Sequence, residues 1–222
     1  MFYYLCNYLI SMCLIEFQHV TKKFSEQFVL NNFSFKINEG DKVQISGRSG
    51  LGKTTLFRLL LGFEKADSGN ILFNNNSLDD KSFWEFRKSV AYISQDLNIG
   101  YGKVRNFFTE TLFLKSNLHI KSKALAMLDN YFDFFEIPVS FLDKNIEELS
   151  GGEKQRIAII NALLLERKIF LLDEISSSLD NLLKIKTIDF FLTKPEFTVL
   201  YISHDKYLPK GIDIKTIKFD VL

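Results

Sequence analysis

The sequence predicts an α/β fold built around a mainly parallel β-sheet. Apolar runs of about five residues alternate with segments of helical periodicity along most of the chain, and this alternation favours a parallel sheet with right-handed crossovers. One predicted strand, at residues 42–46, leads directly into a glycine-rich turn and then into a helical segment. The 222 residues suit one large unit, so we expect a single domain over residues 1–222.

The first elements are expected to be strands. Residues 13–17 and 33–37 alternate between apolar and polar side chains, as half-buried strands do. Residues 42–46 are predicted to form a buried strand, and a helix is expected over 53–61. A further strand is expected at 70–73.

The middle of the chain changes character. A short helix at 82–88 and a strand at 90–93 are followed by residues 104–136, which carry no strand pattern. Apolar side chains recur there at helical spacing: Ala124, Leu125, Leu128, Tyr131 and Phe132. We therefore expect a helical subdomain, over about residues 97–160, inserted into the α/β core.

The strand and helix alternation resumes after the insertion. Residues 151–165 are predicted to form a long helix and residues 168–172 an apolar strand. A helix over 179–192 and a buried strand over 198–202 follow. These elements extend the parallel sheet.

Composition excludes several classes of protein. Twenty-eight basic and 27 acidic side chains give a net charge of +1, so neither nucleic-acid binding nor electrostatic anchoring to lipid is expected. Cys6 and Cys13 form no CxxC pair, which argues against a zinc site and against a disulfide framework. A reducing cytosol is the simplest location.

The first residues are apolar but short. Residues 1–15 carry no charge, yet Glu16 ends the run before the roughly 20 residues that a membrane span requires. The segment also lacks the basic start of a signal peptide. Two alternatives stay open: Met1 is the true start, or Met12 is and residues 1–11 are an extension.

Residues 47–54 match the phosphate-binding pattern G-x-x-x-x-G-K-[ST] between a predicted strand and a predicted helix. Backbone N–H groups of such a loop surround a phosphate, and the helix N-terminus adds its positive dipole end. Lys53 is expected to reach the β- and γ-phosphates, and the Thr54 hydroxyl to bind Mg²⁺. The sequence thus indicates a P-loop NTPase core that binds ATP through Gly47, Arg48, Ser49, Gly50, Leu51, Gly52, Lys53, Thr54 and Thr55.

A second apolar strand, at 169–172, ends in Asp173 and Glu174. A strand of a parallel sheet delivers its C-terminal residues to the ligand crevice. Asp173 is therefore expected to hold the Mg²⁺ shell. Glu174 is expected to polarise the attacking water.

A second helix start suited to a phosphate lies at residues 149–153. Ser150 caps the predicted helix, and Gly151 and Gly152 permit close approach of a ligand. A capping box before an amphipathic helix would account for the same residues. The phosphate loop at residues 47–54 favours phosphate binding over a purely structural cap at this motif.

Taken in order, these motifs resemble those of the ABC ATPase family, from about residue 13 to the C-terminus. The run from Leu149 to Arg156 is similar to the family signature, and Gln95 to its Q-loop glutamine. Residues 177–180, with Asp180, resemble the D-loop. His204 is similar to the switch histidine, and Phe24 occupies the place of the ring that stacks on adenine.

The resemblance implies a fold and a mechanism. The fold is a P-loop NTPase core with a mainly parallel sheet, an N-terminal antiparallel β-subdomain and an inserted helical subdomain. Two subunits bind two ATP molecules in a sandwich, where Ser150, Gly151 and Gly152 of one subunit cover the phosphate held by Lys53 of the other. Glu174, His204, Lys53 and Gln95 are the implied catalytic residues, and Thr54, Gln95 and Asp173 the implied Mg²⁺ ligands.

The resemblance also implies a separate integral membrane permease, with this chain at the cytoplasmic face of the cell membrane. Ile175 and Ser176 stand where most members carry Pro-Thr, and Phe24 replaces the commoner tyrosine. Ile175 and the stretch 144–156 together resemble the corresponding residues of the small bacterial FetA-type subfamily. A metal ion such as iron is then the expected cargo of the ATPase-driven transporter.

Two other functions are compatible with part of the sequence. A soluble ABC ATPase, such as one for iron–sulfur cluster assembly, is also a single small domain, whereas DNA-repair members need a coiled coil that the 53 residues between Gln95 and Leu149 do not accommodate. An idle ATP-binding clamp is the second. The presence of Lys53, Asp173, Glu174 and His204 argues against that clamp.

Overall fold

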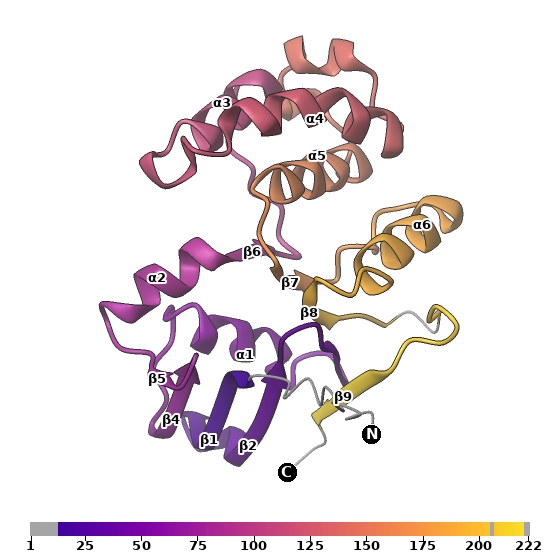
Figure 1. The fold of residues 1–222 in the computed structure, drawn as a ribbon. Helices are drawn as coiled ribbons and strands as arrows, with labels where there is room; N and C mark the ends of the chain where they lie inside the picture. Colours follow the sequence, from indigo (N-terminus) through magenta and orange to yellow (C-terminus); the bar gives the residue numbers. More distant parts are fainter. Residues whose placement is uncertain (1–12, 205–206, 220–222) are drawn as a thin grey trace, which may run out of the picture.

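The computed structural model describes residues 13–204 and 207–219 (Figure 1). The expected extension over residues 1–11 and the alternative start at Met12 lie outside the described residues. Within the described part, the strands form two sheets. The fold therefore has the mixed architecture that the sequence predicts.

The antiparallel sheet has the strand order β2-β1-β4-β5. It consists of β1 (Cys13–Phe24), β2 (Gln27–Asn38), β4 (Ser68–Phe73) and β5 (Asn76–Ser77). The long hairpin of β1 and β2 extends beyond the short runs expected at 13–17 and 33–37, and its pairing contains several register shifts. The expected N-terminal antiparallel subdomain is confirmed.

The second sheet is parallel, with the strand order β6-β7-β8-β3-β9. It consists of β6 (Val90–Ile93), β7 (Ile169–Asp173), β8 (Thr198–Ile202), β3 (Lys42–Gly47) and β9 (Ile214–Phe219). The first four agree with the predicted strands to within one residue. The sequence reading missed β9, because its mixed apolar and lysine pattern carries no clear period of two.

Helices separate most of these strands. They are α1 (Lys53–Leu60), α2 (Ser82–Ser89), α3 (Val104–Leu112), α4 (Lys121–Phe134), α5 (Gly151–Leu164) and α6 (Asn181–Leu192). Three short 3₁₀ turns, η1 (Lys115–Asn117), η2 (Val139–Asp143) and η3 (Ile146–Glu148), complete the described elements between α3 and α5. Within the described residues, no helix is both long and apolar enough to cross a membrane.

The central strands separate two hydrophobic cores. All five residues of β7 are buried, and its side chains alternate between the two faces. Phe170 and Leu172 join the core beside α3 to α6, whereas Ile169 and Leu171 join the core that contains α1 and the antiparallel sheet. A strand buried on both faces holds its C-terminal end rigidly, and the functional side chains begin there.

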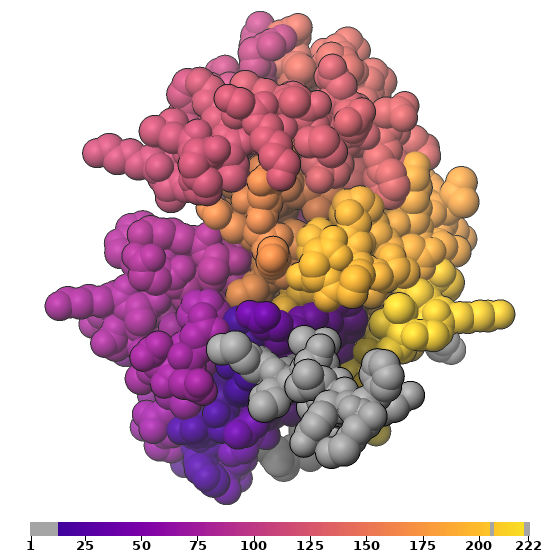
Figure 2. Space-filling model, in the orientation of Figure 1, coloured from indigo at the N-terminus to yellow at the C-terminus, as the bar shows by residue number. Residues whose placement is uncertain are grey.

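The helices α3, α4 and α5 lie together at one end of the molecule (Figure 1). Helix α5 contacts α3 and α4, and it also contacts β6. In the space-filling view, the orange and yellow-orange segments that include α5 and α6 lie between these helices and the sheets (Figure 2). The expected inserted helical subdomain is therefore present, and α5 joins it to the core.

Candidate nucleotide-binding site

The phosphate loop joins β3 to α1 and closes around its own lysine. Gly52 is the N-cap of α1 in a left-handed conformation, with φ 88°, and a Cβ there would collide with Val29 of β2. The Lys53 side chain is buried, and its Nζ donates hydrogen bonds of 3.0 Å to the carbonyls of Gly47 and Arg48. The loop thus holds a positive charge in a backbone cradle.

Three adjacent strands deliver further polar groups to this loop. The Thr54 hydroxyl donates to Asp173 Oδ2 over 2.9 Å. Gln95 Nε2, just after β6, donates to Glu174 Oε2 over 3.1 Å, and His204 Nε2, just after β8, lies 3.2 Å from Glu174 Oε1. The Glu174 carboxylate is therefore bracketed by an amide and an imidazole.

These groups surround a hollow of about 410 Å³. The residues that line it are Ser49, Gly50, Gly52, Lys53, Thr54, Gln95, Glu174, Ile202 and His204. All of them except Ile202 are predicted from the sequence, and they come from four separate stretches of the chain. Their convergence follows from the parallel order of β6, β7 and β8, whose carboxyl ends share one edge of the sheet.

Glu174 has an unusual backbone conformation. Its φ of 52° lies in the left-handed region, which a residue with a Cβ rarely adopts. Its N–H donates to the carbonyl of Ile202 over 3.0 Å, so β8 holds the turn in place. Non-glycine residues in such conformations cluster at functional sites, and this turn aims the carboxylate into the hollow.

The environment of Asp173 fits a divalent cation. The side chain is 1% exposed, and its Oδ1 is buried without a hydrogen-bond partner among the described residues. Burial raises the pKa of Asp173, and the nearby Glu174 raises it further, whereas the Thr54 hydroxyl and Lys53 lower it. A buried carboxylate with an unused oxygen is a suitable ligand for a hard cation.

The donor set is compatible with Mg²⁺. Among the described residues, no group of three or more His, Cys, Asp and Glu side chains could hold a metal by itself. Mg²⁺ typically takes one or two protein oxygens and completes its shell with water and substrate phosphates. Asp173 and Thr54 would hold it. Gln95 lines the same hollow as Thr54, but its amide donates to Glu174, so its expected role as a ligand remains a prediction.

We expect Asp173→Asn to remove stabilisation by MgATP without unfolding the protein. At a ligand concentration 100 times the parent Kd, MgATP should stabilise the parent by about 2.7 kcal/mol, and the variant by less than about 1 kcal/mol. The unliganded variant should be at least as stable, because a desolvated charge is lost. Thermal unfolding with and without MgATP measures both; an undiminished shift would contradict the assignment.

The second helix start is capped, and its signature residues do not line the hollow. Ser150 Oγ accepts from the Glu153 N–H over 3.3 Å, and the Ser150 N–H donates to Glu153 Oε2 over 2.7 Å, so the capping box is present. A Cβ on Gly152 would lie 2.7 Å from the carbonyl of Ser178. Ser150, Gly151 and Gly152 do not line the hollow that contains Lys53.

Two other predicted residues have local partners. Asp180 is the N-cap of α6, where its Oδ1 accepts from the N–H groups of Leu182 and Leu183 at 3.0 Å each. Phe24 stands at the end of β1 and is 44% exposed. Neither residue lines the hollow, so their expected roles remain predictions.

The sequence reading overlooked two residues that shape the site. Ile202 lines the hollow and accepts the Glu174 N–H through its carbonyl. Val29 packs against Gly52 and places the β1–β2 hairpin beside the phosphate loop. Both lie in ordinary apolar strands, and only the tertiary contacts distinguish them.

Comparison with known proteins agrees with this geometry. Residues 30–177 match the ABC transporter family. FetA of Escherichia coli (strain K12), whose name describes a probable iron export ATP-binding protein, is 32% identical over 196 residues, which cover 87% of this chain and 85% of FetA.

Two solved structures have the same fold. CbiO1 of Clostridium perfringens, part of the ABC transporter complex CbiONQ, aligns with a TM-score of 0.75 at 25% identity, over 93% of this chain and 85% of CbiO1. A dimeric ATP-binding cassette in a post-hydrolysis state, bound to ADP and Pi, aligns with a TM-score of 0.73 at 26% identity. That alignment covers 86% of this chain and 88% of the cassette.

Proposed function

This chain belongs to the ABC transporter family and is an ATPase of its ATP-binding type, and from that premise we propose that it powers a membrane transporter through ATP-dependent dimerisation. The observation that carries the proposal is the Glu174 carboxylate, held by Gln95 and His204 at the mouth of the phosphate loop. The proposed cargo is a metal ion such as iron, as the name of FetA describes for that protein.

The residues of the hollow divide the work of hydrolysis. Lys53 exchanges its bonds to the Gly47 and Arg48 carbonyls for bonds to the β- and γ-phosphates, and the loop N–H groups surround them. Glu174 orients the attacking water and accepts its proton, while His204 and Lys53 offset the charge that develops on the γ-phosphate. When bound, Mg²⁺ neutralises phosphate charge. Phe24 stacks on the adenine.

Dimerisation completes the site. Because Ser150, Gly151 and Gly152 do not line the hollow of their own chain, a second subunit is needed to bring a helix start to the γ-phosphate. A twofold arrangement supplies two such helix starts to two ATP molecules. Gly152 lies close to Ser178, so the signature residues 149–156 pack against the segment that ends in Asp180. Both segments would therefore reach the dimer interface together.

The output surface is proposed to lie between the core and the helices. A second hollow, of about 260 Å³, is lined by Ser94, Leu97, Ile99 and Phe107 on one side and by residues of α5 on the other. Gln95 connects this segment to Glu174, so loss of the γ-phosphate can be transmitted to it. We propose that a permease binds here, at the cytoplasmic face of the membrane, and that residues 97–160 move as the helical subdomain.

An affinity experiment tests the transport function. Glu174→Gln protein with ATP should capture a multi-pass membrane protein, in near-equal amount, from detergent-solubilised membranes of the source organism, as identified by mass spectrometry. The same bait with ADP should capture much less. Exclusively soluble partners would contradict the proposal and favour an iron–sulfur assembly ATPase.

A second variant tests the output surface. We expect Leu97→Asp to reduce permease capture about tenfold or more, because a charge would be buried in an apolar contact. Leu125→Asp serves as the control, since Leu125 is 49% exposed on α4 and does not line this hollow. Equal capture by the two variants would place the partner elsewhere.

A further inference from the structure

The tip of the β1–β2 hairpin stands next to the phosphate loop. Val29 of β2 contacts Gly52, and Phe24 lies nearer the tip, where it pairs with Gln27. The Phe24 ring is 44% exposed and has no aromatic neighbour among the described residues. An exposed ring at the end of a hairpin needs another group to fix its orientation.

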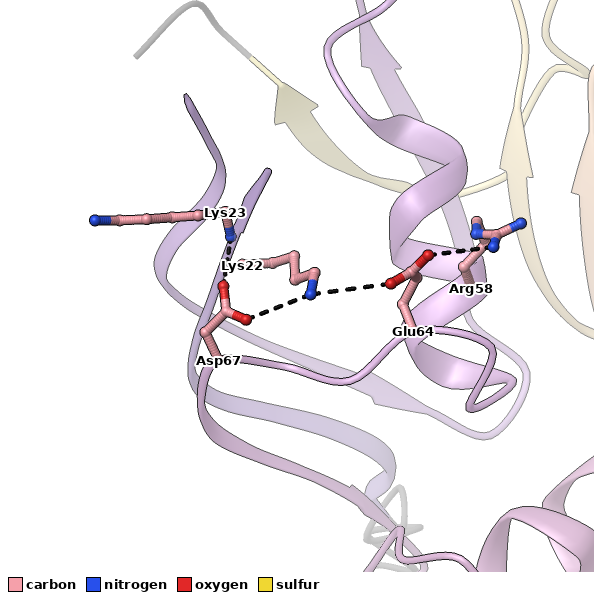
Figure 3. Close-up of polar contacts among 5 residues, drawn as sticks. All are labelled: Lys22, Lys23, Arg58, Glu64 and Asp67. Atoms are coloured by element: carbon pink, nitrogen blue, oxygen red, sulfur yellow. Dashed lines mark hydrogen bonds and ion pairs between the residues drawn. The ribbon is translucent and has the colours of Figure 1, made fainter. Parts of the chain in front are cut away.

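Two carboxylates hold the Lys22 ammonium group in place (Figure 3). Its Nζ lies 3.3 Å from Asp67 Oδ1 and 3.9 Å from Glu64 Oε2, and its side chain is only 11% exposed. Asp67 Oδ2 also accepts the N–H of Lys23 over 2.6 Å, and the Asp67 N–H donates to the carbonyl of Thr21 over 2.9 Å. The loop before β4 therefore forms hydrogen bonds with the backbone of β1 and an ion pair with one of its side chains.

The network continues to the helix of the phosphate loop. Glu64 Oε1 accepts from Arg58 of α1 over 3.2 Å, so Arg58, Glu64, Lys22 and Asp67 form a chain of alternating charge (Figure 3). Helix α1 begins at Lys53, the residue proposed to bind the phosphates. The chain of charges thus connects the phosphate-binding helix to the hairpin that carries Phe24.

The held ammonium group also contacts the ring itself. Lys22 Nζ lies over the Phe24 ring, 5.1 Å from its centroid, within the range of a cation–π interaction. A cation on one face leaves the opposite face of the ring available for a planar base. Because two carboxylates keep the ammonium in place, the ring is held before the base arrives, and less conformational entropy is lost on binding.

We infer that Lys22, held by Asp67 and Glu64, is a positioning residue that orients Phe24 for stacking on the adenine base. This inference rests on the proposed function and deepens it, since it separates recognition of the base from recognition of the phosphates. Recognition of the base then depends on Phe24 and the Arg58–Glu64–Lys22–Asp67 network, whereas recognition of the phosphates depends on Lys53. A purely structural role for the network would affect both parts of the nucleotide alike.

The test compares ATP with inorganic tripolyphosphate, both with Mg²⁺, by isothermal titration calorimetry. Lys22→Met keeps the apolar stem and removes the charge. We expect the Kd for ATP to rise about three- to tenfold, since a partly desolvated cation–π contact is lost, while the Kd for tripolyphosphate stays nearly constant. In a Phe24→Ala background, Lys22→Met should have no further effect on ATP.

Lys23→Met is the matched control. The Lys23 side chain points away from Asp67, its Nζ lies 4.1 Å from the centroid of Phe28, and its bond to Asp67 uses the backbone N–H (Figure 3). Lys23→Met removes the same charge at the neighbouring position, and the Kd for ATP should be unchanged. Asp67→Asn keeps an acceptor for the Lys23 N–H and should shift the Kd for ATP in the same direction as Lys22→Met, which covers the case in which Lys22→Met unfolds.

The possible outcomes are distinguishable. Equal losses for ATP and tripolyphosphate, or additive effects of Lys22→Met and Phe24→Ala, would overturn the positioning role. Unchanged ATP binding by Phe24→Ala would overturn the adenine contact and this inference with it. A parent protein that binds neither ligand would contradict the proposed function itself.

Discussion

Glu174→Gln should lower the rate of ATP hydrolysis by about 10²- to 10³-fold while ATP binding is retained, because a carboxylate that accepts a proton is replaced by an amide of nearly the same shape. The Gln95 amide and the His204 imidazole both contact Glu174 oxygens, so the variant keeps one acceptor oxygen in place. The left-handed backbone at residue 174 tolerates glutamine as well as glutamate. Steady-state phosphate release and ATP binding measure the two effects separately.

Glu166→Gln provides the matched control for this experiment. Glu166 has a φ of 53°, nearly the same as Glu174, and pairs with Lys123 on the surface away from the hollow. The control should hydrolyse ATP at the parent rate. If Glu174→Gln also did so, Glu174 would not be the catalytic base, and the proposed division of roles in the hollow would be wrong.

Lys53→Met should raise the Kd for ATP by at least about 100-fold. Two charge-assisted hydrogen bonds to the phosphates, each contributing about 1.5–3 kcal/mol, would be lost. Hydrolysis should fall at least as far, since Lys53 also offsets charge in the transition state. Calorimetric titration with ATP gives the affinity, and phosphate release at saturating ATP gives the rate.

The control for Lys53→Met addresses both charge and folding. Lys65→Met removes the same charge at a side chain that is 80% exposed and outside the hollow, so ATP binding should be unchanged. Lys53→Met leaves the Gly47 and Arg48 carbonyls without their present donor, and thermal unfolding must show that the fold survives. Parent-like affinity in a folded Lys53→Met protein would exclude Lys53 from phosphate binding.

Much of the fold followed from local pattern. The runs at 90–93, 168–172 and 198–202 were recognisable because a strand buried on both faces is almost continuously apolar. The strand at 42–46 was recognisable because it leads directly into the glycine-rich phosphate loop. The helix expected over 151–165 was recognisable from its capping residues and its length. β9 escaped detection because its side chains alternate imperfectly, and its place depends on pairing with β3.

The sequence by itself determined the chemistry of this protein. A glycine-rich loop that ends in Lys53 and Thr54, and an apolar strand that ends in Asp173 and Glu174, predict phosphate and metal binding wherever a parallel sheet brings them together. These signals are local, because each depends on a few consecutive residues whose backbone conformation the sequence dictates.

Only the tertiary structure decided how the parts meet. It placed Gln95 and His204 on the two oxygens of Glu174, left Asp173 Oδ1 buried and unpaired among the described residues, and left Ser150 outside the lining of the hollow that contains Lys53. It also joined Lys22 to Asp67, 45 residues apart, and placed the Lys22 ammonium group over the Phe24 ring. Such contacts depend on strand order and on the packing of loops between strands, and no short stretch of sequence encodes them.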